Sequence, residues 1–266
     1  MKDFTVEFEK IKNLIASDTP FAFSKFSDGE VSVLQNNTIV LAKDYFIQGD
    51  LHGDETKLAG SYLPEERKEF VPAKHEFFHK KLIEAFKFRK KNYFKGIPAQ
   101  NASYGDVSWK FCTELYGKGD EEHLSFANLL LNANYHRFIT EVLPLFVDKS
   151  VVVICNENAD LSELPFPVVK DFRCGTNCMI NNYDMIGEVS KWVEDHDVTE
   201  HLFLFSASTL SNYLIYNLYK NFDTNQYLDI GSALGYHFKL KGCYLRGYLD
   251  MYWNKGLLLN EIDIWN

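Results

Sequence analysis

The residues best suited to chemistry lie in the segment Ser27-Asp28-Gly29-Glu30, where two carboxylates flank a glycine. Carboxylate oxygens are the ligands that hard divalent cations such as Mg²⁺ prefer, and such cations often carry the phosphates of a substrate. The same residue types are also common in surface turns, because aspartate and glycine favour turn conformations. The segment alone therefore leaves two interpretations open, a metal–phosphate site and a plain turn.

Two further segments carry small polar residues that could contact a ligand. The first, Ser206-Ala207-Ser208-Thr209, precedes a predicted helix, so its backbone N–H groups could bind phosphate. Ordinary helix capping explains its hydroxyl groups equally well. The second, Asp229-Ile230-Gly231-Ser232, follows a predicted strand. The carboxylate of Asp229 suits a ribose hydroxyl, a metal ion or a backbone turn, and the sequence leaves these roles open.

Each of the three segments follows a short apolar run that we predict to be a β-strand. Residues 21–26 alternate between apolar and polar, whereas 202–205 and 226–230 are largely apolar. In an open α/β sheet the carboxyl ends of parallel strands meet at one edge, and ligands bind outside that edge. We therefore expect the three segments to lie together.

The rest of the chain alternates between strand-like and helix-like patterns. We predict further strands at 38–42, 93–97, 151–155 and 168–172, a polar loop at 43–55, and helices at 3–16, 54–63, 73–91, 107–116, 135–146, 182–196 and 209–219. This alternation predicts an α/β fold, a single Rossmann-like domain with a mostly parallel sheet flanked by helices. No linker or repeat is visible, so we predict one domain over residues 1–266 with a core at about 21–235. The tail 239–266 has no clear pattern.

Composition excludes several classes of protein. The formal net charge is −9, and an acidic chain is poorly suited to sequence-independent nucleic-acid binding. No apolar run approaches the roughly 18 residues of a membrane span, and no signal-peptide pattern opens the chain. We therefore expect a cytoplasmic protein. The five cysteines are an odd number without a secretion signal, which favours free thiols over disulfides or structural zinc.

A basic stretch between Lys80 and Lys95 contains seven Lys or Arg residues and one Glu. A solvated helix face is the simpler interpretation. The alternative is a local attraction for an anionic acceptor or for lipid headgroups, which would place the protein at the inner face of a membrane as a peripheral protein.

The segment Lys25-Phe-Ser-Asp-Gly-Glu30 is similar to the Arg-Phe-Gly-Asp-Gly-Glu signature of GT-D-type glycosyltransferases. Four other segments resemble the same family in the same order. They are Tyr93–Pro98, the apolar strand Val151–Cys155, Leu202–Ala207, and Leu228–Gly231. Each segment is a loose match, and their order and spacing carry the resemblance, which runs from about residue 21 to 235.

The resemblance implies a Rossmann-like enzyme that moves a sugar from a nucleoside-diphosphate donor, expected to be a UDP-sugar. The acceptor would be a glycan, a glycoprotein or a lipid-linked sugar, as in surface polysaccharide assembly. Asp28 and Glu30 would be the catalytic pair and would hold a divalent cation, Mn²⁺ or Mg²⁺, with the donor diphosphate. Other residues would bind the donor: Lys25, Ser27, Gly29, Ser206, Ala207, Ser208, Asp229 and Ser232.

The chain departs from the family pattern at three positions. Lys25 replaces an arginine, so it would meet phosphate as a point charge and not as a bidentate fork. Ser27 replaces a glycine, and Ser232 stands where a histidine is expected. His237 is an alternative metal ligand five residues further on, although an incidental histidine is the simpler interpretation.

An inverting transferase also needs a carboxylate base near the acceptor hydroxyl. The candidates are Glu30, Asp229, Asp54 and Glu157, and the sequence does not choose among them or between inversion and retention. A non-catalytic nucleotide-sugar-binding or interaction protein of the same fold is the main alternative function.

A methyltransferase that uses S-adenosylmethionine is a weaker alternative. The segment Tyr227–Gly235 resembles the glycine-rich first motif of such enzymes. Only 31 residues follow Gly235, however, and a βαβ unit takes about 30.

Overall fold

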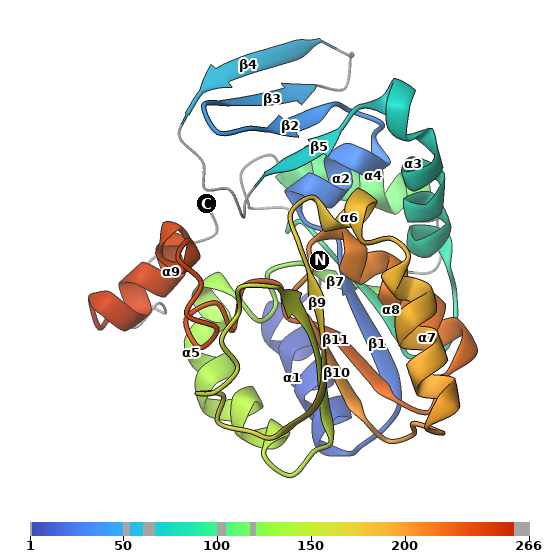
Figure 1. Ribbon diagram of the computed structural model, residues 1–266, viewed down its shortest axis with the longest axis vertical. Coiled ribbons are helices and arrows are strands. Elements are labelled where there is room, and N and C mark those ends of the chain that lie inside the picture. The colour runs from blue at the N-terminus through green and yellow to red at the C-terminus, as the bar shows by residue number, and fades with distance from the viewer. Residues whose placement is uncertain (1, 50–53, 61–66, 100–104, 118–120, 258–266) are drawn as a thin grey trace.

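The computed structural model describes residues 2–49, 54–60, 67–99, 105–117 and 121–257. Its centre is a sheet of seven strands in the order β7-β6-β1-β11-β10-β8-β9 (Figure 1). Every neighbouring pair in this sheet is parallel. The strands are β1 (Phe21–Lys25), β6 (Tyr93–Ile97), β7 (Leu124–Phe126), β8 (Val151–Asn156), β9 (Val168–Cys174), β10 (Leu202–Phe205) and β11 (Gln226–Asp229). The predicted α/β fold with a parallel sheet is confirmed.

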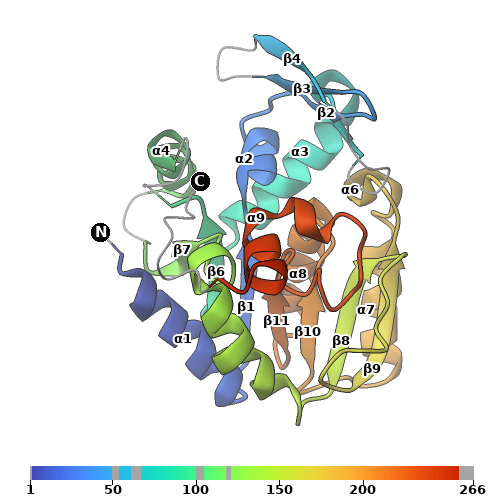
Figure 2. The ribbon, with the colours of Figure 1, turned by 90° about the vertical axis from the view of Figure 1, so that its left-hand side faces the viewer.

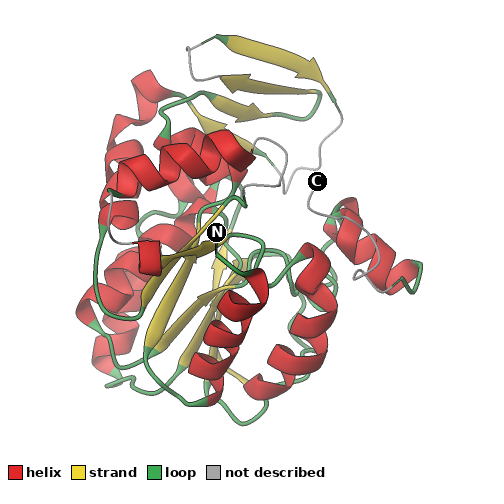
Figure 3. Cartoon of the chain, turned by 180° about the vertical axis from the view of Figure 1, so that it is seen from behind, coloured by secondary structure: helices red, strands yellow, loops and turns green. Residues whose placement is uncertain are grey.

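Two hydrophobic cores lie on the two faces of this sheet, because successive side chains of a strand point to opposite faces. In β1, Phe21 and Phe23 belong to one core and Ala22 to the other. The first core contains α1 (Phe4–Ala16) and a helical segment at residues 135–146, which face the viewer in Figure 2. Figure 3 shows the strands, in yellow, between helices on both sides.

The second core is covered by helices from both halves of the chain. They are α2 (Asp28–Leu34), α3 (Pro72–Lys87), α4 (Gly105–Tyr116), α6 (Cys178–Asn181), α7 (Met185–Asp195) and α8 (Thr209–Asn221). The segment 135–146 on the other face is helical throughout but changes type along its length. It consists of α5 (Tyr135–Arg137), a π-helical turn η4 (Phe138–Val142) and a 3₁₀ turn η5 (Leu143–Phe146).

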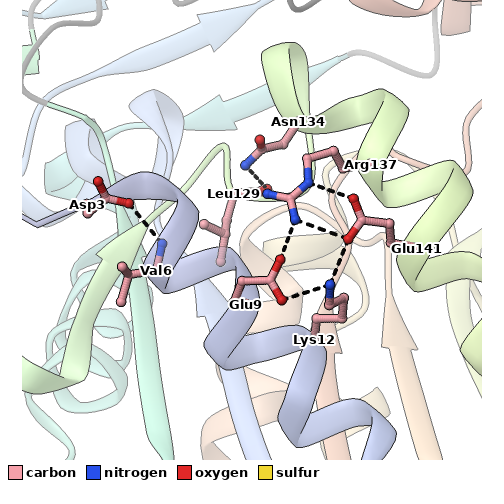
Figure 4. Close-up of polar contacts among 8 residues, drawn as sticks. All are labelled: Asp3, Val6, Glu9, Lys12, Leu129, Asn134, Arg137 and Glu141. Atoms are coloured by element: carbon pink, nitrogen blue, oxygen red, sulfur yellow. Dashed lines mark hydrogen bonds and ion pairs between the residues drawn. The ribbon is translucent and has the colours of Figure 1, made fainter.

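An ion-pair network joins α1 to this segment (Figure 4). Arg137 contacts Glu9 and also donates from Nε to Glu141 at 2.7 Å. Lys12 contacts the same two carboxylates, at 2.8 Å from Glu9 and 2.7 Å from Glu141. Hydrogen bonds from Arg137 and Lys12 lower the pKa of Glu141 to about 2. The network therefore joins α1 to the segment 135–146 at the rim of the core that they share.

A second, antiparallel sheet lies between α2 and α3 in the chain and at one end of the molecule (Figure 1). Its order is β4-β3-β2-β5, with β2 (Ile39–Leu41), β3 (Tyr45–Gly49), β4 (Glu55–Ala59) and β5 (Lys68–Phe70). The prediction of a loop over 43–55 is wrong for the part that the structure describes, because residues 45–49 form β3. The helix predicted at 54–63 is also wrong, since residues 55–59 form β4. Residues 50–53 and 61–63 of these predictions lie outside the described residues.

The error at β4 has a physical cause. All five of its residues are exposed, so no apolar alternation marks the strand. Backbone pairing with β3 holds it in place, with Ile47 opposite Lys57, and such non-local pairing leaves no local signal. The pair Asp54-Glu55 imitates the acidic start of a helix.

The tail packs on the face that carries α1. It contains a 3₁₀ turn η6 (Cys243–Leu245), α9 (Gly247–Leu249) and a π-helical turn η7 (Asp250–Asn254). Trp253 Nε1 donates to the hydroxyl of Tyr135 at 2.9 Å, and that hydroxyl donates to the carbonyl of Ala233 at 3.1 Å. The tail is thereby held against the loop that follows β11.

Three of the seven Lys and Arg residues in the basic stretch between Lys80 and Lys95 form ion pairs within the described part of the chain, and a fourth is buried. Lys80, Lys81 and Lys90 each form an ion pair with a nearby carboxylate. Lys95 is fully buried, with its ammonium over the rings of Tyr93 and Tyr116. This pairing favours the interpretation as a solvated helix face. No helix within the described residues is both long and apolar enough to cross a membrane.

Candidate active site

The three segments singled out in the sequence meet at one edge of the large sheet. Strands β1, β11 and β10 are neighbours, so their carboxyl ends lie side by side. The backbone N–H of Lys25 donates to Asp229 Oδ2 at 3.2 Å, which joins the first segment to the third. Ser206 Oγ donates to the carbonyl of Gly231 at 2.6 Å, which joins the second to the third.

Glu30 is buried and ties three elements together. Its Oε2 accepts from the backbone N–H of Ser27 at 3.1 Å, which caps the start of α2. Its Oε1 accepts from the hydroxyl of Thr209, the first residue of α8, at 2.8 Å. The ammonium of Lys68 on β5 lies 3.8 Å from the same oxygen. Both carboxylate oxygens therefore have protein partners already.

Asp28 differs from Glu30 in its surroundings. It is exposed, at the first position of α2, where the helix dipole favours a negative charge. Among the described residues, no three or more His, Cys, Asp or Glu side chains are gathered as a metal site. Magnesium-type cations often bind through one or two carboxylates and the phosphates of a substrate. The residues fit a cation that arrives with a diphosphate, and do not form a cage of protein ligands.

Two lysines contact the turn that carries Asp28. Lys25 Nζ donates to Ser27 Oγ at 2.9 Å. On the other element, Lys68 Nζ lies 3.1 Å from the position that a Cβ on Gly29 would take. Two positive charges from β1 and β5 thus contact the turn that carries one exposed carboxylate, an arrangement that can receive a phosphate anion.

Gly231 allows a close approach between the loop after β11 and Lys25. Its φ is +52°, in the left-handed region that side chains other than glycine adopt at a cost. A Cβ at this position would lie 2.8 Å from Lys25 Cε. Glycine is therefore needed here both for its backbone conformation and for the space that Lys25 occupies.

Asp229 lies beneath this turn and is buried. Its Oδ1 accepts from the backbone N–H of Gly231 at 3.0 Å, in addition to the bond from Lys25. Burial raises the pKa of Asp229 to about 7, although the charge of Lys25 and the Gly231 N–H oppose this effect. The sequence left three roles open for Asp229: binding a ribose hydroxyl, binding a metal ion, or holding a backbone turn. Both contacts come from backbone N–H groups, as in the third role.

The segment before α8 is constrained as well. Ser208 is exposed and has φ +47° and ψ −144°, a conformation that is uncommon for a residue other than glycine. The N–H of Ala207 donates to Ser211 Oγ at 3.1 Å, and its carbonyl accepts from Cys178 Sγ at 3.1 Å. This backbone is therefore fixed from two sides, and the serine points away from the core.

The position where a histidine was expected contacts the tail. Ser232 Oγ lies 2.8 Å from the hydroxyl of Tyr248, which is buried. His237 lies beside the rings of Tyr236 and Trp253. No described contact joins His237 to Asp28 or Glu30, so the arrangement does not bring this histidine together with the carboxylates.

The two remaining base candidates, Asp54 and Glu157, are exposed. Asp54 precedes β4 of the small sheet, and Glu157 follows β8 at the carboxyl edge of the large one.

Three residues of the site escaped the sequence reasoning. Lys68 lies outside every motif, and nothing in its neighbourhood marks it. Asn212 on α8 is buried and donates to the carbonyl of Lys25 at 2.9 Å. The sequence feature that could have revealed it is an amide side chain among the apolar residues of that helix. Tyr248 lies in the tail, which shows no pattern.

Comparisons with known proteins identify the fold. No family model matches the chain, and no curated protein matches it. Solved structures do match. One is described as the highly conserved domain of unknown function 1792 with a distinct glycosyltransferase fold. It is 11% identical, covers 96% of this chain and 81% of its own, and has a TM-score of 0.56.

A second structure is described as a new glycosyltransferase (DUF1792) from Streptococcus sanguinis. It is 11% identical, covers 99% of this chain and 92% of its own, and has a TM-score of 0.56. A selenomethionine-substituted DUF1792 structure gives 12% identity, coverage of 95% and 87%, and a TM-score of 0.54. At such low identity the likeness concerns the fold alone, an α/β fold shared with the glycosyltransferase-fold structures.

Proposed function

We propose that the protein is a glycosyltransferase that moves a sugar from a nucleoside-diphosphate donor, expected to be a UDP-sugar, to a glycan or glycoconjugate acceptor. The observation that carries the proposal is the turn at the carboxyl edge of the sheet that carries the exposed carboxylate of Asp28 and is contacted by the ammonium groups of Lys25 and Lys68. Nucleotides bind at this edge in open α/β folds. The likeness of the fold to glycosyltransferase structures adds support.

The donor diphosphate would lie between the two lysines, over the turn that contains Gly29. Each ammonium group offsets part of the negative charge that develops as the sugar leaves. The turn before α8 would add backbone N–H groups to the phosphate oxygens. A bound Mn²⁺ or Mg²⁺ would neutralise charge on the leaving diphosphate, and Asp28 would hold it on the protein side.

Glu30 has a different part in this proposal. Its partners Ser27, Thr209 and Lys68 make it the residue that positions Asp28 and the start of α8. If the reaction inverts, a carboxylate must take the proton of the acceptor hydroxyl. Asp54 and Glu157 are exposed and better suited to this step than Glu30 or Asp229. Variants D54N and E157Q would test them, with loss of kcat at unchanged UDP affinity as the expected result for the base.

The test of the proposed function is thermal stabilisation by UDP with and without Mn²⁺, followed by hydrolysis of a panel of nucleotide sugars. We expect metal-dependent stabilisation by UDP and slow hydrolysis of one donor. Stabilisation without turnover of any donor would favour a non-catalytic binding protein. Stabilisation by S-adenosylhomocysteine and by no nucleoside diphosphate would favour a methyltransferase.

A further inference from the structure

A cavity of about 330 Å³ lies beside the loop that follows β11. Its volume is at the lower end of the range, about 300–1,000 Å³, of cavities that hold small ligands. The residues that matter for its chemistry are Tyr236, His237, Lys239, Tyr244 and Glu163. None of them has a part in the donor site described above.

Two aromatic rings form a corner in this cavity. Tyr236 stacks on Trp253 with the ring centroids 4.0 Å apart and the planes 6° from parallel. Tyr244 meets Tyr236 at 72° with a centroid distance of 6.2 Å. Both tyrosines remain exposed, Tyr236 by 36% and Tyr244 by 41%. The electron-rich face of such a ring attracts the C–H groups on the flat face of a pyranose ring.

Polar groups lie beside these rings. Lys239 is ion-paired with Glu163 at 2.7 Å and with Asp160 at 3.1 Å, at the side of the cavity. Nδ1 of His237 is buried and finds no hydrogen-bond partner among the described residues. Because Nδ1 is buried, a ligand in the cavity would meet the other ring nitrogen of His237, Nε2.

The cavity lies close to the donor site along the chain. Tyr236 follows Gly231 by five residues, and Gly231 lies against Lys25. Five residues span at most about 18 Å when fully extended. The loop is more compact than that, because the N–H of Phe238 bonds to the carbonyl of Leu234. Tyr236 therefore lies within about 18 Å of Gly231, a span that a short oligosaccharide can bridge.

We propose that this cavity binds a sugar unit of the acceptor glycan. Tyr236 and Tyr244 stack on the pyranose ring, and His237 with the Lys239–Glu163 pair bonds its hydroxyl groups. The inference rests on the proposed function, because an acceptor presupposes a transferase. Beyond the proposed function, the inference names which part of the acceptor the protein recognises. That part is a sugar ring stacked on aromatic side chains, and not a lipid or a bare peptide.

The test uses the full chain and two probes, cellobiose and N,N′-diacetylchitobiose, in saturation-transfer NMR. We expect saturation of the sugar ring protons by the wild type, and a loss of affinity of about tenfold in Tyr244→Ala. His237→Gln is the second variant, with a smaller loss. Phe77→Ala is the matched control, because Phe77 is an aromatic residue on α3 with 51% exposure. Its affinity should equal that of the wild type.

Three outcomes would overturn the inference. They are no saturation of either probe by the wild type, unchanged binding in Tyr244→Ala, and saturation of the uracil protons of UDP that is lost in Tyr244→Ala. The last would assign the cavity to the donor.

Stabilisation by UDP and Mn²⁺ is measured on the same samples and should be unchanged in Tyr244→Ala. If it is absent from the wild type while sugar binding depends on Tyr244, the proposed function fails, and the cavity is a sugar site without an acceptor role. If it is present while sugar binding is not, only the sugar site fails.

Discussion

The hydroxyl of Thr209 donates a 2.8 Å hydrogen bond to Glu30 Oε1, between residues 179 positions apart in the sequence. Both residues are buried. The bond joins the first turn of α2 to the first turn of α8, and with them the turns that follow β1 and β10. This hydrogen bond therefore helps to position Asp28 relative to the Ser206–Ser208 segment, although neither Thr209 nor Glu30 is proposed to react.

A double-mutant cycle measures this bond. Thr209→Val removes the hydroxyl at nearly constant volume, and Glu30→Gln removes the charge. A hydrogen bond to a charged group contributes about 1.5–3 kcal/mol, so we expect a coupling energy of this order in denaturant unfolding. The cycle isolates the pair, since the Lys68 contact is lost equally with and without Thr209. Additive effects within about 0.5 kcal/mol would contradict the contact.

Asp28→Asn should abolish metal-dependent stabilisation by UDP and any sugar transfer while the fold stays intact. The side chain is exposed, and its loss removes only a favourable charge at a helix start, worth about 0.3–1 kcal/mol. Asp106→Asn is the matched control, because Asp106 is also an exposed aspartate in the first turn of a helix. Equal transfer rates in both variants would remove Asp28 from the site.

Stability should depend on pH through Asp229. Burial raises the pKa of its carboxyl to about 7, whereas an unfolded aspartate titrates near pH 3.9. Between these values the native state binds more protons than the unfolded state, so the free energy of unfolding from this group falls as pH rises from about 4 to 7. The loss is on the order of 4 kcal/mol at most and is complete above pH 7.

The measurement compares the wild type with Asp229→Asn in denaturant unfolding at pH 5 and pH 8. The difference between the two slopes isolates Asp229 from the other titrating groups. We expect a steeper decline in the wild type. Parallel pH profiles would mean that the carboxyl titrates normally in the folded protein.

Gly231→Ala should weaken UDP binding and lower stability by about 1 kcal/mol. The left-handed backbone at this position is strained for alanine, and the new Cβ would displace the end of the Lys25 side chain. Gly187→Ala is the control. Gly187 lies in α7 with no atom within 4 Å of the added Cβ, so this change should raise stability by about 0.5–1 kcal/mol. Unchanged UDP affinity in Gly231→Ala would separate Lys25 from the donor.

Six of the seven strands of the large sheet were predicted, and β7 was not. The predicted runs 93–97 and 202–205 have the same bounds as β6 and β10. β10 is buried and continuously apolar, the pattern that sequence alone reveals for a strand inside a parallel sheet. β6 contains Lys95 and Gly96, and Pro98 follows its end. In the small sheet only β2 was predicted, by the run 38–42. β4 was not predictable, since it is exposed on both faces and is held by backbone pairing.

The site was predictable in outline for a related reason. Parallel strands end at one edge, so the meeting of Lys25 with Asp229 followed from the order of elements. The different surroundings of Asp28 and Glu30 could not be foreseen, because they depend on Thr209 and Lys68, which are distant in sequence. Ser232 likewise meets Tyr248 through the path of the tail.

Lys25 and Lys68, which contact the turn that carries Asp28, belong to two strands whose backbone amides should exchange with solvent at different rates. β1 lies inside the large sheet, between β6 and β11, so its amides should exchange with solvent only on global unfolding. β5 is an outer strand of the small sheet, paired with β2 alone within that sheet. Its amides should exchange through local opening. A ligand that engages Lys68 would therefore slow hydrogen exchange in β5 long before it changed that of β1, so occupancy of the site can be read from one short strand.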